Sequence, residues 1–177
     1  QEELLLKNIE SKVVLVTGAG GSIGSELCRQ IIKAKPKSLI LCELSEYSLY
    51  KIYEELKLVN NNLKIVPLVC NIQDENKINE VLKTFSIDTL YHSAAYKHVP
   101  LVEANICEGV KNNVFGTYVV AKASIEQGVS NFVLISSDKA VRPTNIMGAS
   151  KRLAELCVQG LFHQNKAQKI KMSLVRF

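Results

Sequence analysis

The feature that most constrains the fold is a regular alternation of short apolar runs with amphipathic segments along the chain. The apolar runs are rich in Val, Ile and Leu, and they lie at residues 12–18, 38–44, 63–70, 87–95, 132–137 and 170–177. Segments of helical period follow them at 22–34, 45–59, 76–85, much of 99–127, and 148–162. Strands that alternate with helices in this way predict a parallel, doubly wound sheet between two helical layers, the Rossmann-like α/β class.

Within the expected strands the apolar residues are continuous, which predicts helices on both faces of the sheet. Sheets of this kind bind ligands beyond the carboxyl ends of their strands. The polar and glycine-rich segments of this sequence fall at those ends. We therefore expect a single domain over residues 1–177, with a helical lead-in at 1–11 and its site along one edge of the sheet.

Composition excludes several other classes of protein. Hydrophobic residues make up 47% and charged residues 22% of the chain, as in globular proteins. No apolar run approaches the roughly 20 residues that cross a bilayer. The N-terminal residues are polar and helix-like, so we expect no signal peptide. No basic stripe interleaves with aromatic residues, so we expect no nucleic-acid partner. No His, Cys and carboxylate cluster has the spacing of a metal site.

Two further expectations concern the ends and the cysteines. The chain starts with Gln and stops inside an expected strand, so we expect a soluble piece of a longer protein. The five cysteines lack CxxC spacing and occupy apolar segments, so we expect them to be reduced and buried, as in a cytosolic protein.

The segment TGAGGSIG joins the first expected strand to the first expected helix and spaces glycines at 18, 21 and 24. Gly18 permits the tight turn, Gly21 lets the backbone approach a pyrophosphate, and Gly24 lets helix pack on strand. The anion would then meet the free N–H groups at the start of the helix, at Ser22 and Ile23. This context predicts a dinucleotide site, and a glycine-rich turn without a ligand is the alternative.

Glu43 ends the second expected strand, nineteen residues after Gly24. A carboxylate at this place accepts the ribose hydroxyls of NAD and repels the additional phosphate of NADP, so we predict NAD as the cofactor. A solvated loop acid is the alternative. The ends of the third and fourth strands supply further residues expected beside the cofactor: Asn71, Ile72, Ala94 and Ala95.

Other polar residues near these strand ends have less defined roles. Lys97 and His98 follow the fourth strand, beside the expected nicotinamide or simply at the surface. His92 precedes two alanines, and we expect it to be structural. Asn113 lies within a helical segment, from which it is expected to bridge to the fourth strand by a hydrogen bond, in a structural or a catalytic role.

Three segments resemble one enzyme family. They are AAYKHVPLVEAN (94–105), VKNNVFGT (110–117) and SSDKAVRPTNIMGASKR (136–152). With the glycine turn, HSAA (92–95) and Lys151, they resemble the extended short-chain dehydrogenase/reductase superfamily and, within it, the bacterial nucleotide-sugar 4,6-dehydratases, over about residues 10–177. A tyrosine usually stands four residues before the lysine, and Met147 in its place resembles the large, membrane-associated branch, which acts on UDP-N-acetylglucosamine in polysaccharide and glycan biosynthesis.

This resemblance implies roles for five residues. Lys139 would be the base at carbon-5 of the sugar, and Asp138 the acid at the leaving 6-hydroxyl, which requires partial burial to keep it protonated. Lys151 would hold the nicotinamide ribose, and Met147 would pack against the sugar or the nicotinamide. The carbon-4 hydroxyl would lose its proton to Ser137, a carboxylate or a water. If the family segments are left out of account, the alternative is that Asp138 and Lys139 form a simple ion pair at a strand end.

The resemblance also implies partners and a location. The parent protein would bind a UDP-sugar and lie on the cytoplasmic side of the bacterial inner membrane. It would have membrane helices before Gln1 and a substrate lobe after Phe177. Homo-oligomers, often dimers, are common among such folds.

Some positions depart from the family, and two other functions stay open. Glu43 and Asn71 stand where the family often has aspartate, and Ser137 stands where it often has threonine. A nucleotide-sugar 4-epimerase would use the same cofactor site without the acid/base pair, but it normally needs the tyrosine. A catalytically silent NAD-binding module is the other alternative.

Overall fold

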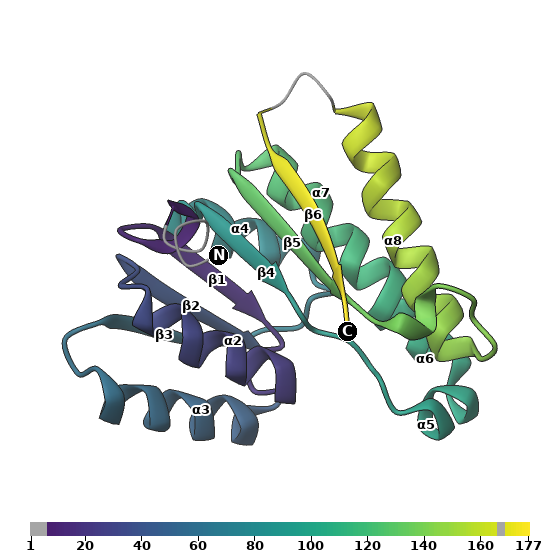
Figure 1. The fold of residues 1–177 in the computed structure, drawn as a ribbon, viewed down its shortest axis with the longest axis horizontal. Helices are drawn as coiled ribbons and strands as arrows, with labels where there is room; N and C mark the ends of the chain where they lie inside the picture. Colours follow the sequence, from purple (N-terminus) through teal and green to yellow (C-terminus); the bar gives the residue numbers. More distant parts are fainter. Residues whose placement is uncertain (1–6, 166–168) are drawn as a thin grey trace.

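A six-stranded parallel sheet forms the centre of the molecule, in a computed structural model that describes residues 7–165 and 169–177 (Figure 1). Its strands are β1 (Val13–Thr17), β2 (Ser38–Glu43), β3 (Lys64–Val69), β4 (Thr89–His92), β5 (Asn131–Ser136) and β6 (Lys171–Arg176). They lie in the order β3-β2-β1-β4-β5-β6, and each neighbouring pair is parallel. The direction of strand order reverses between β1 and β4, which is where such sheets bind ligands. The Rossmann-like prediction is confirmed.

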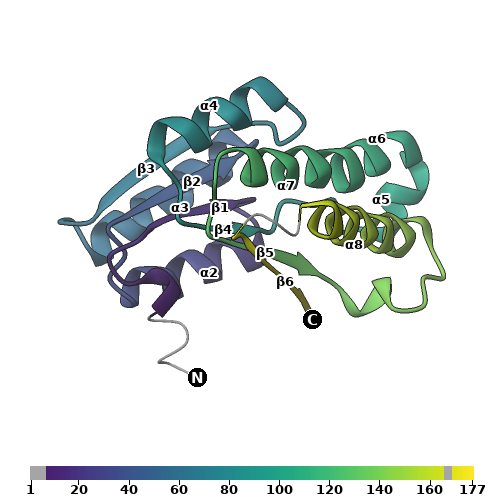
Figure 2. The same cartoon turned by 90° about the horizontal axis from the view of Figure 1, so that it is seen from above.

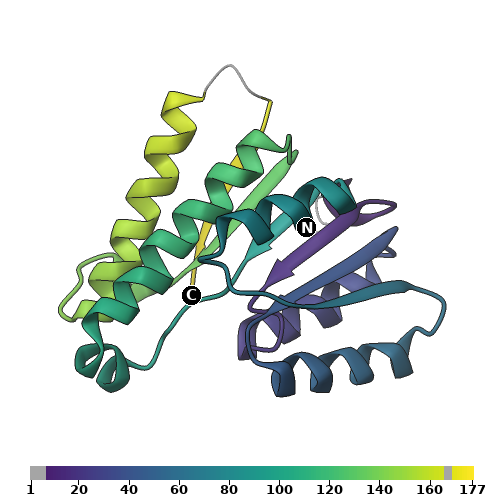
Figure 3. The ribbon, with the colours of Figure 1, turned by 180° about the vertical axis from the view of Figure 1, so that it is seen from behind.

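Helices cover the sheet in two layers. They are α2 (Ser22–Lys33), α3 (Glu46–Val59), α4 (Glu75–Phe85), α5 (Val99–Ala104), α6 (Ile106–Val110), α7 (Thr117–Glu126) and α8 (Ile146–Gln164). Figure 2 shows α4, α7 and α8 on one face and α2 and α3 on the other, and Figure 3 shows α7 and α8 side by side. None of the described helices combines the length and apolar character needed to span a membrane. Of the expected lead-in, residues 7–9 are helical, and residues 1–6 lie outside the described part.

The expected helical region within 99–127 is broken into several pieces. Asn105, with φ −137°, separates α5 from α6, and a π-helix η1 (Lys111–Gly116) joins α6 to α7. A π-helix accommodates an extra residue per turn and often occurs at functional sites. In η1 it places the side chains of both Asn112 and Asn113 in buried positions.

Both faces of strand β1 are buried in hydrophobic clusters. Val13 and Leu15 belong to a cluster with residues of α4, α7 and α8, and Val14 and Val16 belong to one with residues of α2 and α3. The prediction of a sheet covered on both faces is therefore confirmed for its inner strands. It is wrong for the edge strands β3 and β6, in which no residue is fully buried and Val175 is 41% exposed. An edge strand has a packed neighbour on one side only, so its flank stays open.

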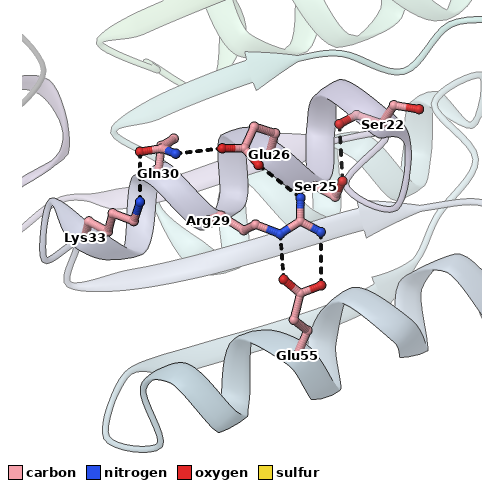
Figure 4. Close-up of polar contacts among 7 residues, drawn as sticks. All are labelled: Ser22, Ser25, Glu26, Arg29, Gln30, Lys33 and Glu55. Atoms are coloured by element: carbon pink, nitrogen blue, oxygen red, sulfur yellow. Dashed lines mark hydrogen bonds and ion pairs between the residues drawn. The ribbon is translucent and has the colours of Figure 1, made fainter.

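An ion pair joins α2 and α3, the two helices that share one face of the sheet. Arg29 of α2 donates to Glu55 of α3 from Nε to Oε1 at 2.5 Å and from Nη2 to Oε2 at 3.0 Å (Figure 4). The hydrogen bond from Arg29 lowers the pKa of Glu55. Both side chains are about 40% exposed, so the pair orients α3 against α2 and contributes less than about 1 kcal/mol to stability.

A chain of buried polar side chains links the sheet to α7. His92 lies between Thr17 Oγ1 at 2.7 Å from Nδ1 and Thr117 Oγ1 at 2.9 Å from Nε2. Burial, with a smaller effect of the Lys151 charge, lowers the pKa of His92 to about 3. The ring therefore stays neutral at pH 7 and ties β4 to β1 and α7, the structural role expected for it.

The cysteines are all free, but they are not all buried. Cys28, Cys42 and Cys70 are buried as expected, whereas Cys107 is exposed and Cys157 is partly exposed. The expectation fails for Cys107 because most residues of the short helix α6 face solvent. Cys157 lies between the buried and exposed faces of α8.

Candidate cofactor and catalytic site

The glycine turn after β1 is shaped by close backbone contacts. Gly18 has φ +66°, and a Cβ there would lie 2.7 Å from Cα of Ala94. A Cβ on Gly24 would lie 2.0 Å from the carbonyl oxygen of Gly18. These two positions therefore need glycine for the turn and for the packing of α2 on β1. A Cβ on Gly21 would lie 3.2 Å from the Gly18 carbonyl oxygen, a tight contact but a less severe one than at the other two positions.

The N-terminus of α2 is suited to an anion. Its N-cap residue Gly21 makes no side-chain cap, whereas α3, α4 and α8 are capped by Ser45, Asp74 and Asn145. The first N–H groups of such a helix, here those of Ser22 and Ile23, have no partner within the helix itself. Lys97 Nζ donates to Ser22 Oγ at 3.2 Å, which adds a positive charge at the same place.

A cavity of about 450 Å³ opens at the carboxyl ends of β1 to β4. Most residues expected beside a cofactor line it: Gly18, Gly21, Glu43, Asn71, Ile72, Ala94 and Ala95. Ser22, Ile23 and Gly24 belong to the first turn of α2, which begins beside Gly21. The size and the mixed polar and apolar lining are typical of small-molecule sites.

Glu43 is held rigidly at this cavity. Its Oε2 accepts from Gly20 N at 3.0 Å, and its Oε1 accepts from Leu44 N at 2.9 Å and Ser45 N at 3.0 Å. The two N–H groups on Oε1 occupy both of its lone pairs, whereas the second lone pair of Oε2 remains available to a ligand hydroxyl. The backbone therefore fixes a carboxylate acceptor at the end of β2, where the sequence predicted one.

Other residues of the cavity wall were not predicted. They are Gly20, Cys42, Leu44, Ser48, Cys70, Ser93, Tyr96 and Asn112, and His98 also lines the cavity. Cys42 and Cys70 directly precede Glu43 and Asn71, so their places at strand ends could have identified them. Asn112 has no such signal, because the π-helix that turns it inward is not evident from the sequence.

Asn113 makes the bridge that the sequence suggested. Its Oδ1 accepts from Tyr96 N at 2.8 Å, and its Nδ2 donates to Tyr96 O at 2.9 Å and to Ser150 Oγ at 3.0 Å. It therefore fixes the segment after β4 against η1 and α8.

The Ser137-Asp138-Lys139 segment forms a single 3₁₀ turn at the end of β5 (η2, Asp138–Ala140). Ser137 Oγ donates to Asp138 Oδ1 at 3.0 Å and accepts from Lys139 N at 3.3 Å. Asp138 Oδ1 lies 3.6 Å from Lys139 Nζ, and the two side chains are 73% and 53% exposed. The Ser137 hydrogen bond, followed by the Lys139 charge, lowers the pKa of Asp138. The expectation of a partly buried, protonated Asp138 is therefore wrong for the free chain.

Lys151 and Met147 lie on the buried face of α8, at 6% and 3% exposure. Lys151 Nζ donates to Ile135 O at 2.8 Å, which holds the ammonium against the end of β5. Burial lowers the pKa of Lys151 to about 8, although Glu155 raises it. The structure thus brings Lys151 to the strand that precedes the Ser-Asp-Lys turn. None of the five residues with predicted catalytic roles lines the 450 Å³ cavity: Ser137, Asp138, Lys139, Met147 and Lys151.

A buried carboxylate, Glu155, was missed by the sequence reading. It is fully buried, and it accepts hydrogen bonds from Ser136 Oγ at 2.7 Å and Arg152 Nη1 at 2.9 Å. It also accepts from Arg176 Nε at 2.9 Å and Nη2 at 2.6 Å. Burial alone would raise the pKa of Glu155, but the bonds from Arg176, Ser136 and Arg152 outweigh it and lower the pKa to about 2. Its place one helical turn after Lys151 was the available signal.

Within residues 7–165 and 169–177, no group of three or more His, Cys, Asp or Glu side chains is placed to hold a metal ion.

A protein-family profile described as "Polysaccharide biosynthesis protein" matches residues 14–177. The capsular polysaccharide biosynthesis protein CapD of Staphylococcus aureus is 46% identical over 175 residues, which are 98% of this chain and 29% of CapD. The probable polysaccharide biosynthesis protein EpsC of Bacillus subtilis is 47% identical over 170 residues, which are 96% of this chain and 28% of EpsC. The chain thus spans less than a third of these two relatives.

Two further similarities are more distant. A UDP-glucose 4-epimerase of Rickettsia rickettsii is 31% identical over 148 residues, which are 81% of this chain and 42% of the epimerase. Among solved structures, Pen from Bacillus thuringiensis is 32% identical with a TM-score of 0.87, over 96% of this chain and 50% of that one.

Proposed function

The chain belongs to the polysaccharide biosynthesis protein family, and from this premise we propose that it is the NAD-binding and catalytic part of a nucleotide-sugar 4,6-dehydratase. The proposed substrate is UDP-N-acetylglucosamine, and the product is its 4-keto-6-deoxy derivative. The observation that carries the proposal is the pair Asp138 and Lys139, 3.6 Å apart at the end of β5. The tyrosine position before Lys151 is occupied by Met147, which has no proton to transfer.

The cavity at β1 to β4 fits the cofactor of this proposal. The turn at Gly21 and the start of α2 would hold the diphosphate, Glu43 would accept from the adenosine ribose, and Asn71 and Ile72 would flank the adenine. Lys151 would reach the nicotinamide ribose from α8. When bound, NAD would accept hydride from carbon-4 of the sugar and return it to carbon-6.

The proton transfers would fall to the turn after β5. Lys139 would take the proton from carbon-5, and Asp138 would give a proton to the departing 6-hydroxyl. Because the two side chains share one turn, they can act on adjacent carbons. In the free chain Asp138 is exposed and held ionised, so the bound sugar must exclude water from this turn and raise the pKa of Asp138. Ser137 would supply a hydroxyl beside carbon-4, in the role that Met147 cannot take.

A nucleotide-sugar 4-epimerase is the second candidate. The exposed, ionised state of Asp138 favours it, as does the similarity to the Rickettsia epimerase. Such an enzyme would use the same cofactor cavity, and the 6-hydroxyl would stay on the sugar.

We extend the proposal to the parent protein, which would act on the cytoplasmic side of the bacterial inner membrane. Its membrane region would lie outside the present chain. It would have a UDP-sugar and not a nucleic acid as its partner, and it would form homo-oligomers.

The function is tested by turnover of the full-length protein with UDP-N-acetylglucosamine in deuterated water. We expect a 4-keto-6-deoxy product with deuterium at carbon-5, and a loss of turnover of about 100-fold or more in Lys139→Met and in Asp138→Asn. Both variants should bind NAD as the unmodified protein does, because neither side chain lines the cofactor cavity.

A matched control is Lys122→Met, which removes a surface lysine of α7 paired with Glu75 and should leave turnover unchanged. Inversion at carbon-4 with the 6-hydroxyl retained would assign the epimerase instead. A full-length protein that binds NAD and UDP-N-acetylglucosamine but converts nothing would be a silent binding module.

A further inference from the structure

Two cysteines lie next to each other in the wall of the cofactor cavity. Cys42 is the penultimate residue of β2, and Cys70 directly follows β3. These strands are neighbours, with Cys42 in register with Leu68, and Cys70 N donates to Glu43 O at 2.9 Å. Both side chains belong to the hydrophobic cluster on the α4 face, and both line the cavity. The fold thus presents a pair of thiols to the same cavity.

The two thiols differ in acidity. A hydrogen bond between the two thiols lowers the pKa of Cys70 despite the opposing effect of burial, and the charge of Lys77 lowers it further. The same hydrogen bond and burial raise the pKa of Cys42. Cys28, buried in the other cluster, has its pKa raised to about 12 by burial. Among these buried thiols, Cys70 is therefore the one that forms a thiolate most readily, and a thiolate is the reactive form.

We propose that Cys42 and Cys70 form a redox-sensitive pair, which peroxide converts into a disulfide that excludes the dinucleotide from the cavity. This inference rests on the proposed cofactor role of the same cavity. Glu43 follows Cys42 and Asn71 follows Cys70. These two residues are the ones proposed to contact the ribose and the adenine. A covalent bond between their neighbours would draw the ends of β2 and β3 together and displace both contacts.

The chemistry balances with hydrogen peroxide as the oxidant. The Cys70 thiolate attacks one peroxide oxygen, the O–O bond breaks, and Cys70 becomes a sulfenic acid as the first water leaves. The Cys42 sulfur then attacks the Cys70 sulfur, the S–O bond breaks, and the S–S bond forms as the second water leaves. Two thiols lose two electrons and two protons in total, and one peroxide becomes two waters. A thiol reductant reverses the reaction by exchange.

The test uses this chain with the two more accessible cysteines replaced, as Cys107→Ser and Cys157→Ser, which leaves Cys28, Cys42 and Cys70. After hydrogen peroxide treatment, titration of the denatured chain should find one free thiol in place of three, and peptide mass spectrometry should find Cys42 linked to Cys70. NAD affinity, measured by calorimetry, should fall at least tenfold and return after reduction. Saturating NAD present during the treatment should slow the loss of thiols.

Two variants keep the test specific. Cys28→Ala should oxidise and lose affinity like its parent, whereas Cys70→Ala should keep after peroxide whatever affinity it had before. A disulfide that leaves NAD affinity unchanged would overturn the inference, and so would thiols that stay free under peroxide. If the untreated chain binds no NAD, the cofactor proposal fails, while the linkage of Cys42 to Cys70 is still decided by mass spectrometry.

Discussion

Replacing Gly24 with alanine is expected to destabilise the chain by about 3 kcal/mol and to weaken NAD binding by at least tenfold. The new Cβ would lie 2.0 Å from the Gly18 carbonyl oxygen and 2.8 Å from Ser93 Oγ. The carbonyl is backbone inside the turn and cannot rotate away as a side chain can. Helix α2 must therefore move off β1, and the N–H groups at its start, beside the cavity residue Gly21, move with it. Urea unfolding and calorimetry measure the two effects.

Gly160 offers the matched control, since it also lies within a helix but a Cβ there would meet nothing within 4 Å. Gly160→Ala should stabilise the chain by about 0.5–1 kcal/mol, because alanine loses less backbone entropy in a helix. Equal stability of the Gly24 and Gly160 variants would show that α2 does not pack on the turn as described.

Replacing Glu155 with alanine should cost about 3 kcal/mol of unfolding free energy. The carboxylate is fully buried and neutralises Arg152 and Arg176, and its loss leaves two cations and Ser136 without their acceptor. The cost lies at the lower end of the range for buried pairs because Arg152 and Arg176 are 38% and 35% exposed and regain water. Urea denaturation at pH 7 measures the loss.

The same group makes stability depend on pH. Its pKa falls from 4.5 to about 2 on folding, so the stabilisation is complete above about pH 4.5 and is lost as the pH falls toward 2. The full effect is about 3 kcal/mol at most, and it should be absent in Glu155→Ala. Glu126→Ala is the control, because its exposed ion pair with Lys122 at 3.8 Å should contribute little to stability. Identical unfolding of both variants across this pH range would contradict the Glu155 account.

Most of the fold could be predicted from the sequence because its signals are local. The apolar runs and the helical periods each extend over a few residues, and they gave the six parallel strands and their helices. The positions of the glycine turn and of Glu43 could also be predicted, because a tight turn and a strand end fix what lies beside them. The edge strands were misjudged, since coverage of β6 depends on which elements reach it and not on its own sequence.

The parts that could not be predicted depend on contacts between distant residues. Glu155 and Arg176 are 21 residues apart and meet because β6 pairs with β5 beside α8. Asn112 reaches the cavity through a π-helix that has no local signal. The exposure of Asp138 was missed because the sequence places it after a buried strand, whereas the chain leaves the sheet there in a 3₁₀ turn.

The central claim is that the cavity between the glycine turn and Glu43 binds NAD. Calorimetric titration of this chain with NAD and then NADP tests it most directly, with Glu43→Gln beside Glu46→Gln, an exposed acid in the first turn of α3, as the control. We expect NAD to bind at least tenfold more tightly than NADP, and we expect this preference to shrink in the Glu43 variant alone. Failure to bind NAD, or equal affinity for both dinucleotides in the unmodified chain, would contradict the claim.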